Sequence, residues 1–175
     1  MEAANHAWRD CQRLALMRQA VRDRAGIPEM KSEPGTYALI LKSNFKGRVQ
    51  VGRWRQIDIQ PGYYIYIGSA FGSGGIQARV LRHFRNDKPR HWHIDYLRER
   101  LNAVGAWYSH DPRRLEHRWA QTLCKADGMS PIKGFGCSDC MCYSHLFLIA
   151  RSPDIALSSR VAKSKLKSWS YQPAR

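Results

Sequence analysis

The sequence has little of what a membrane or secreted protein needs. No stretch approaches the run of about 20 apolar residues that spans a bilayer. The N-terminal stretch also lacks the charged-then-apolar layout of a secretion signal, because Arg9, Asp10, Arg13 and Arg18 interrupt it. These absences argue against a membrane protein and predict a protein that functions in the cytoplasm.

Cysteine is scarce and odd in number. The five cysteines are Cys11, Cys124, Cys137, Cys140 and Cys142. A disulfide framework needs pairs of cysteines and an oxidising compartment, so an odd number without a secretion signal argues against one. We therefore expect these thiols to be reduced.

Acidic residues are also few. The 175 residues include 29 Lys and Arg but only 14 Asp and Glu, which leaves a formal charge of +15 and a pI near 10.1. A solubilising surface or a contact with an anionic membrane would also be basic. However, arginine outnumbers lysine, and aromatic residues lie among the cations, as at residues 53–55 (Arg-Trp-Arg) and 90–93 (Arg-His-Trp-His). Guanidinium groups bind phosphates and aromatic rings stack on bases, so nucleic acid is the favoured partner, and no obligate protein partner is indicated.

Patterns along the chain predict one domain over residues 35–150. Short runs rich in strand formers alternate with turn signals, and helical spacing follows the glycine-rich loop at 72–75. The expected strands cover residues 36–41, 48–51, 56–59, 63–68, 103–108 and 143–150, and the expected helices cover residues 75–85, 93–100 and 112–126. This order indicates an α+β fold with a small, mainly antiparallel central sheet flanked by helices.

Two flanking segments complete the expected organisation. In residues 1–34, apolar residues at helical spacing predict an amphipathic helix over 5–25, followed by a linker into the domain. Residues 151–175 are rich in serine and basic residues, so we expect a basic tail that is flexible or loosely docked. At the last helix, Asp111 is expected to be the capping residue, because Pro112 needs no hydrogen-bond partner at the first helical position.

Two tyrosines lie on strands that are expected to be neighbours. Tyr37 follows Gly35-Thr36, and Tyr66 precedes Ile67-Gly68. A tyrosine on a strand is most often a packing residue, which is the structural alternative to a catalytic role.

Arg79 and His83 are four residues apart in the helix that follows the glycine-rich loop, which places them on one face. Arg79 can bind a phosphate through two parallel hydrogen bonds. In a chain this basic, the alternative is a solvated helix face.

Glu116 is the only carboxylate between Pro112 and Lys125. A carboxylate is the hard oxygen ligand that Mg²⁺ prefers, with water and substrate phosphate in the remaining positions. The alternative is an acid placed near a helix start by the helix dipole.

Taken together, Gly35-Thr36-Tyr37, Tyr66-Ile67-Gly68, Arg79 and Glu116 resemble the GIY-YIG nuclease superfamily, and within it the Uri-type subgroup. The likeness covers residues 35 to about 148. The stretches that carry the closer match are residues 61–70 (PGYYIYIGSA), 91–97 (HWHIDYL), 134–140 (GFGCSDC) and 144–147 (SHLF). The first motif has threonine in place of isoleucine, and residues 42–60 insert an extra hairpin between the two motifs, as in that subgroup.

The resemblance implies a phosphodiester hydrolase that uses one Mg²⁺ or Mn²⁺ ion. Tyr37 or Tyr66 would deprotonate or orient the attacking water, Arg79 would bind the phosphate, and Glu116 would bind the metal. Because the pKa of a free tyrosine is near 10, the proton could pass to a second group, for which His83 is one candidate. Basic residues near this helix are expected to contact the substrate: Arg82, Lys88, Arg90, His91 and His93.

The resemblance therefore implies an endonuclease, with DNA favoured over RNA as its substrate. The alternative is a catalytically silent nucleic-acid-binding module of the same fold, since the charge alone accounts for binding.

The cysteine-rich segment leaves a second metal open. Cys137, Cys140, Cys142 and His145 have the ligand types of a structural Zn²⁺ site. Four ligands within nine residues are cramped, so a reduced loop whose conformation matters is the favoured interpretation. Asp139, in the same loop, is expected to approach the active site.

Overall fold

The computed structural model describes residues 30–85, 88–153, 157 and 166–170. The chain divides into two units, Met1–Met30 and Lys31–Arg175, and the fold below is that of the second. The helix expected over residues 5–25 lies outside the described residues.

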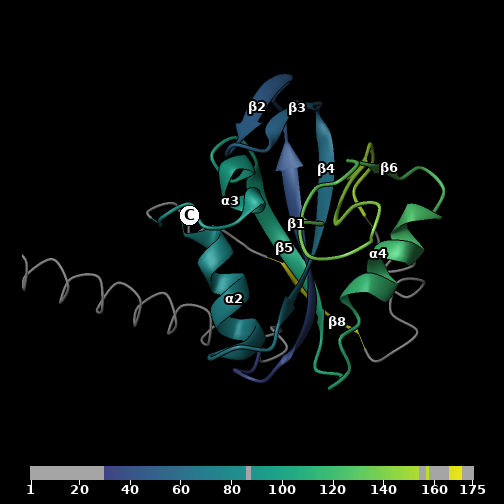
Figure 1. The fold of residues 1–175 in the computed structure, drawn as a ribbon. Helices are drawn as coiled ribbons and strands as arrows, with labels where there is room; N and C mark the ends of the chain where they lie inside the picture. The colour runs from purple at the N-terminus through teal and green to yellow at the C-terminus, as the bar shows by residue number, and fades with distance from the viewer. Residues whose placement is uncertain (1–29, 86–87, 154–156, 158–165, 171–175) are drawn as a thin grey trace, which may run out of the picture. The chain divides into compact units, whose positions relative to one another are not determined.

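A central antiparallel sheet forms the middle of the second unit (Figure 1). Its strand order is β6-β7-β4-β1-β5-β8, with every neighbouring pair antiparallel. The strands are β1 (Gly35–Ser43), β4 (Gly62–Ala70), β5 (Asn102–Ser109), β6 (Ser130–Pro131), β7 (Leu146–Ile149) and β8 (Lys167–Ser170). With α2 (Gly75–Phe84), α3 (His93–Leu97) and α4 (Glu116–Cys124), this arrangement confirms the predicted α+β fold with a mainly antiparallel central sheet.

A separate two-stranded sheet lies between β1 and β4 in the chain. It consists of β2 (Gly47–Val51) and β3 (Arg55–Ile59), paired antiparallel. Its apolar positions alternate, with Val49, Ile57 and Ile59 buried. It lies at the top of the molecule in Figure 1, and β2 contacts α3.

The two faces of the central sheet bury different side chains, because neighbouring residues of a strand point to opposite faces. One face carries Ala38 and Ile40 of β1 and Ile65 and Ile67 of β4, which pack in one apolar cluster with Trp119 of α4. The other face carries Tyr37 and Leu39, opposite Gly68 and Tyr66 of β4. This second face is the one that meets α2, and it therefore holds both motif tyrosines.

The last helix begins later than the sequence predicted. It starts at Glu116 rather than Pro112, and Leu115 is its N-cap without a side-chain cap. Asp111 does not cap it: its Oδ1 accepts hydrogen bonds from the backbone and side chain of Arg113, at 2.9 Å each. The backbone N–H of Leu115 instead donates to Thr36 Oγ1 of β1 at 3.1 Å. A bond to the sheet therefore anchors the start of α4.

Part of the segment expected to form the C-terminal tail belongs to the sheet. Lys167–Ser170 forms β8, which pairs with β5, and Trp169 is buried there with its ring against Phe84 of α2 at 4.7 Å between centroids. The contact between Trp169 and Phe84 is apolar, whereas the prediction of a tail rested on the many polar residues of this segment.

Among the described residues, none of the helices combines the length and apolar character needed to span a lipid bilayer.

Candidate active site

Tyr37 and His83 form a hydrogen-bonded pair on the α2 face of the sheet. The Tyr37 hydroxyl lies 2.8 Å from Nε2 of His83, and both side chains are buried. The Tyr37 ring crosses over Gly68 of β4: a Cβ at Gly68 would meet the Tyr37 hydroxyl at 2.6 Å. The glycine of the second motif is thus required for close approach, and it lets the phenol reach across the neighbouring strand.

Tyr66 lies beside this pair. Its ring centroid is 6.1 Å from that of His83 and 6.1 Å from that of Phe135, both in edge-on contacts. Burial raises the pKa of both tyrosines, and the negative charge of Glu116 adds to the effect. Burial, followed by the positive charge of Lys88, lowers the pKa of His83. At neutral pH the site therefore holds two protonated phenols and a neutral imidazole.

Arg79 lies near the tyrosines with its guanidinium on the face of Trp92, 4.2 Å from the ring centroid. Among the described residues, no carboxylate forms an ion pair with it. Its positive charge lowers the pKa of both Tyr37 and Tyr66, against the larger effect of burial. Stacking on Trp92 orients a guanidinium whose N–H groups remain available for an anion.

Glu116 comes from the helix on the opposite face, yet its charge acts on both tyrosines. β7 pairs with β4 only from Tyr63 to Tyr66, and the Ile67 amide bonds to the His145 carbonyl just before β7 begins. At this point Glu116 Oε1 lies 3.3 Å from Nδ1 of buried His145, an ion-pair distance without the angle of a hydrogen bond. Glu116, the first residue of α4, thus lies beside His145, whose backbone bonds to β4 one residue past Tyr66.

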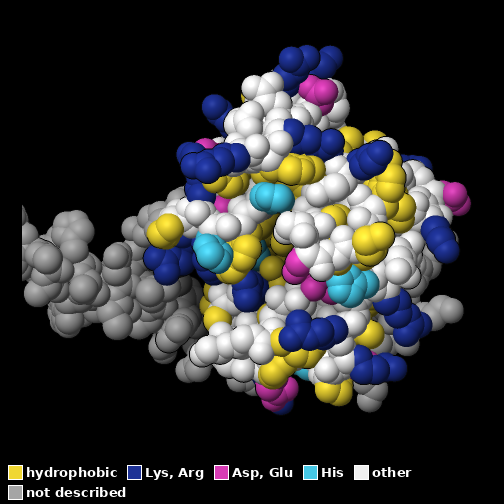
Figure 2. All heavy atoms as spheres, viewed as in Figure 1, with side chains coloured by type: hydrophobic (Ala, Val, Ile, Leu, Met, Phe, Trp, Pro, Cys, Tyr) yellow, Lys and Arg dark blue, Asp and Glu magenta, His cyan; other side chains and the backbone are white. Residues whose placement is uncertain are grey.

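The surroundings of the site are basic. Figure 2 shows Lys and Arg side chains around a central area of this face where histidine, acidic and hydrophobic side chains gather. In the matching ribbon view, that area lies between α2 and α3 on one side and α4 on the other (Figure 1). Such a rim attracts a polyanion and directs it toward the centre.

Two residues expected to contact the substrate have a different role. Arg82 binds Asp95 through two hydrogen-bonding nitrogens, and Lys88 Nζ lies 2.7 Å from Asp95 Oδ1. The Lys88 side chain is only 6% exposed. Asp95 also accepts the backbone N–H groups of His91 and Trp92. A buried carboxylate needs such partners, so Arg82 of α2 and Lys88 both stabilise Asp95 of α3, a structural role that the sequence analysis did not assign to them.

Replacing Asp95 with asparagine should lower the free energy of unfolding by about 3–5 kcal/mol, because it leaves Lys88 and Arg82 as uncompensated buried charges. Burial alone would raise the pKa of Asp95, but its hydrogen bonds to Arg82 and Lys88 hold that pKa well below the usual value. Its contribution is therefore fully present above about pH 4 and is lost as the pH falls through the lower, folded-state pKa. Urea unfolding at about pH 7 measures the first effect, and the decline in stability from about pH 4 to about pH 2 measures the second.

The matched control is Asp58→Asn. Asp58 pairs with Arg48, but both side chains are 73% exposed, so the loss should stay within about 1 kcal/mol. Equal urea midpoints for the two variants would contradict the structural role of Asp95.

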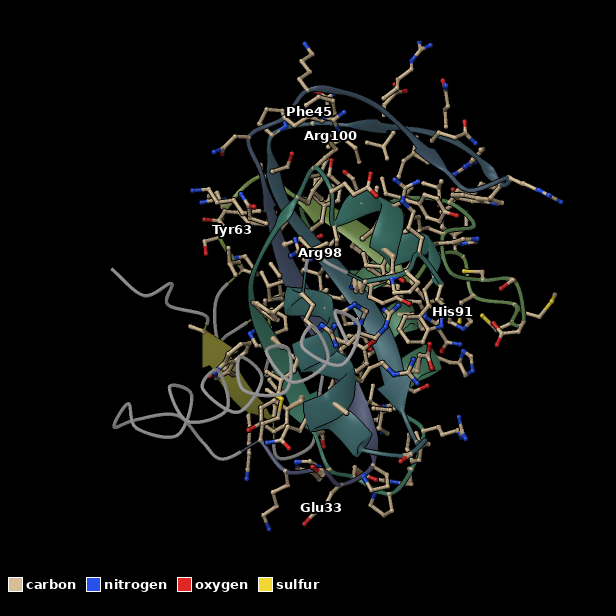
Figure 3. All side chains as sticks on the ribbon, turned by 90° about the vertical axis from the view of Figure 1, so that its left-hand side faces the viewer. Glu33, Phe45, Tyr63, His91, Arg98 and Arg100 are labelled. Atoms are coloured by element: carbon tan, nitrogen blue, oxygen red, sulfur yellow. The ribbon has the colours of Figure 1, made fainter. Side chains whose placement is uncertain are left out.

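The other expected substrate contacts lie on the surface. Arg90 forms an exposed ion pair with Glu99, and His93 stacks on Trp54 with 5.3 Å between centroids. His91 is exposed and packs edge-on against Trp92, the residue beneath Arg79. Figure 3 shows His91 to the right of the central strands and Tyr63 to their left. Of Arg90, His91 and His93, His91 is the residue that contacts Trp92, on which Arg79 also stacks.

The cysteine-rich loop forms a cluster with α4. Ligand atoms of His117, Cys140, Cys142 and His145 all lie within 4.8 Å of one another, so this group could hold a metal ion. Cys137 is not part of it, and its thiol is directed instead toward the Phe135 carbonyl at 3.4 Å. His117, and not Cys137, thus completes this group of four; the sequence analysis had named Cys137 as the fourth residue of a possible zinc site.

Sequence reasoning missed three residues that shape the site: Asp95, Trp92 and His117. Asp95 had a detectable signal, since an acid three residues after Trp92 matches the helix-capping spacing. The signal for Trp92 was weaker: it is an aromatic residue that lies among basic residues in the sequence. His117 had none, because a ligand 23 residues before Cys140 is brought to it only by the packing of α4.

The structure thus defines an α+β domain whose candidate site lies over β1 and β4, the two central strands of the six-stranded sheet, with basic side chains around it. The chain belongs to the family described as Domain of unknown function DUF123, whose model matches residues 36–167. That match begins at Thr36 of β1 and ends at Lys167, the first residue of β8. No curated protein and no solved structure matches the chain.

Proposed function

We propose that this protein is a divalent-metal-dependent endonuclease of the GIY-YIG type that hydrolyses phosphodiester bonds in DNA. The observation that carries the proposal is the grouping around His83: the Tyr37 hydroxyl lies 2.8 Å from its Nε2, the Tyr66 ring lies 6.1 Å from its ring, and Arg79 stacks on Trp92, whose ring is 6.0 Å away. The charges of Arg79 and Glu116 also contribute to the pKa of both phenols. The side chains of Tyr37, Tyr66, Arg79 and Glu116 come from β1, β4, α2 and α4, so no single local motif brings them together.

The protein's own groups supply the proton transfer. Water attacks the phosphorus in line, and its proton passes to the Tyr37 oxygen while the Tyr37 proton moves to Nε2 of His83, 2.8 Å away. His83 can accept that proton because its lowered pKa keeps it neutral. The pair acts as a relay, so the high pKa of the buried phenol is no obstacle.

Two further groups act on the phosphate. Arg79, oriented on Trp92, donates two N–H groups to the non-bridging oxygens and holds them as charge builds up. Glu116, half-buried, offers a carboxylate oxygen to Mg²⁺ or Mn²⁺, since its contact with His145 uses only Oε1. When bound there, the ion stabilises charge on the phosphate and on the leaving 3′ oxygen.

A non-catalytic DNA-binding module is the second candidate, and one observation favours it. Tyr37 is only 2% exposed, so water reaches its hydroxyl with difficulty before substrate binds. The formal charge of +15 would by itself give salt-sensitive binding.

Purified protein with Mg²⁺ or Mn²⁺ should cut single-stranded, double-stranded or branched DNA, and Arg79→Ala should reduce the rate by about 10²–10³-fold. Arg48→Ala is the matched control: it removes an exposed arginine from the two-stranded sheet and should change the rate by no more than about twofold. Equal cleavage by wild type and Arg79→Ala would indicate a contaminating nuclease. Binding without cleavage of any substrate would favour the second candidate.

A further inference from the structure

Cys137, Cys140 and Cys142 lie in one loop whose two ends are joined to each other by backbone hydrogen bonds. The Gly134 amide bonds to the Tyr143 carbonyl at 2.8 Å, and the His145 amide bonds to the Phe135 carbonyl at 2.9 Å. Ser144 Oγ lies 2.8 Å from the Ile132 carbonyl and 2.7 Å from the Leu146 carbonyl, so its one hydrogen can be donated to either of them. These bonds fix where the loop begins and ends, and within it Cys142 lies beside His117 of α4 while Cys140 lies beside His145.

Two nitrogen–sulfur pairs lie inside the cluster. Nε2 of His145 is 3.2 Å from Sγ of Cys140, and Nδ1 of His117 is 3.2 Å from Sγ of Cys142. In a tetrahedral site with bonds of about 2.0 Å to nitrogen and about 2.3 Å to sulfur, such atoms are about 3.6 Å apart. Small side-chain rotations therefore suffice to place all four around one ion.

We propose that His117, Cys140, Cys142 and His145 bind one structural Zn²⁺ ion that fastens the cysteine-rich loop to the start of α4. Two thiolates and two imidazoles are the donor set and geometry that suit zinc. The four protein ligands fill the coordination shell, so this ion is structural and distinct from the catalytic ion at Glu116.

The site also positions a residue of the proposed active site. Nδ1 of His145 faces Oε1 of Glu116 at 3.3 Å, while Nε2 faces the cluster. A carboxylate behind the remote nitrogen of a metal-bound histidine is a common supporting contact in zinc sites, and it fixes the ring orientation. Here His145 faces Glu116 through Nδ1 and the cluster through Nε2, so one imidazole would join the zinc site to the carboxylate of the proposed active site.

The test is metal analysis of the full chain, expressed without a polyhistidine tag and purified without added zinc. Elemental analysis should find about one zinc per chain. Cys142→Ser and His117→Gln should lose nearly all of it, whereas Cys137→Ser and Cys124→Ser, whose thiols lie outside the cluster, should keep it. His117 is exposed, so its replacement leaves the core intact.

Cobalt provides a second measurement that does not depend on variants folding. Wild-type protein reconstituted with Co²⁺ should show the intense visible bands of a tetrahedral ion and a near-ultraviolet thiolate charge-transfer band, which Cys137→Ser leaves unchanged. The proposal is overturned if neither zinc nor cobalt binds, if iron is the bound metal, or if Cys137→Ser empties the site while His117→Gln keeps it full. None of these outcomes depends on nuclease activity.

Discussion

Replacing Glu116 with glutamine should lower Mg²⁺-dependent DNA cleavage by at least about 100-fold, since a metal contributes several kcal/mol of charge stabilisation. Glutamine keeps the size of the side chain but removes the charge that a hard cation requires. DNA binding measured without metal should stay the same or tighten, because a negative charge next to a polyanion has been removed. Cleavage rates and fluorescence-anisotropy titrations at fixed salt measure the two effects separately.

Glu99→Gln is the matched control for this prediction. Glu99 is a half-exposed carboxylate paired with Arg90, and its loss should leave cleavage nearly unchanged. Zinc content provides a second control: Glu116→Gln should keep its zinc, because Glu116 touches His145 without belonging to the cluster. Wild-type cleavage by Glu116→Gln would remove Glu116 from the catalytic set.

Replacing Tyr37 with phenylalanine should reduce the cleavage rate by about 10²–10⁴-fold, the range expected for a lost proton-transfer group. The hydroxyl removed is the one that lies 2.8 Å from Nε2 of His83. Because the two side chains act as one relay, the double variant with His83→Gln should lose no more activity than the more damaging single variant. Single-turnover kinetics on all three variants measure this coupling.

Tyr64→Phe is the control for the loss of a buried hydroxyl. Tyr64 is buried on the same strand as Tyr66, but its hydroxyl bonds to the backbone of Gln60. The variant should lose some stability, about 1 kcal/mol, and little activity. Additive losses in the Tyr37 and His83 double variant would show that the two residues act independently and would exclude the relay.

The relay also predicts a particular pH dependence. The pKa of His83 lies well below its usual value, so the neutral form that accepts the proton predominates above about pH 6.5. The single-turnover rate should therefore be flat from about pH 6.5 to 9 and fall only at lower pH. A tyrosinate base would instead make the rate rise tenfold per pH unit through this range, because burial raises the pKa of Tyr37 well above 10.

Local patterns were enough to predict the elements that carry the motifs. The strands around Tyr37 and Tyr66 and the helix with Arg79 and His83 all formed, because period-two and helical spacing of apolar residues is a property of short segments. The same reasoning misplaced the start of α4. Asp111-Pro112 has the right local chemistry for a cap, but Arg113 takes the carboxylate and Thr36 of β1 anchors the helix further along.

Partner choice among charged residues could not be predicted. Arg82 and Lys88 read as free cations in a basic chain, yet Asp95 binds both. The amino-acid sequence alone does not indicate which of the many basic residues will form an ion pair with a given acidic residue. The choice follows from the burial of Asp95 between α2 and α3, where an unpaired charge would be too costly.

The amino-acid sequence alone determined the basic surface, the α+β class and the residue types able to bind phosphate and metal, since these depend on composition and short-range periodicity. Only the tertiary structure decided which of them meet. Glu116 at the start of α4 lies 3.3 Å from His145, whose backbone bonds to Ile67 of β4, and α4 also brings His117, rather than Cys137, into the group of residues that could hold a metal. Both results depend on contacts between segments distant in the chain, which no local pattern encodes.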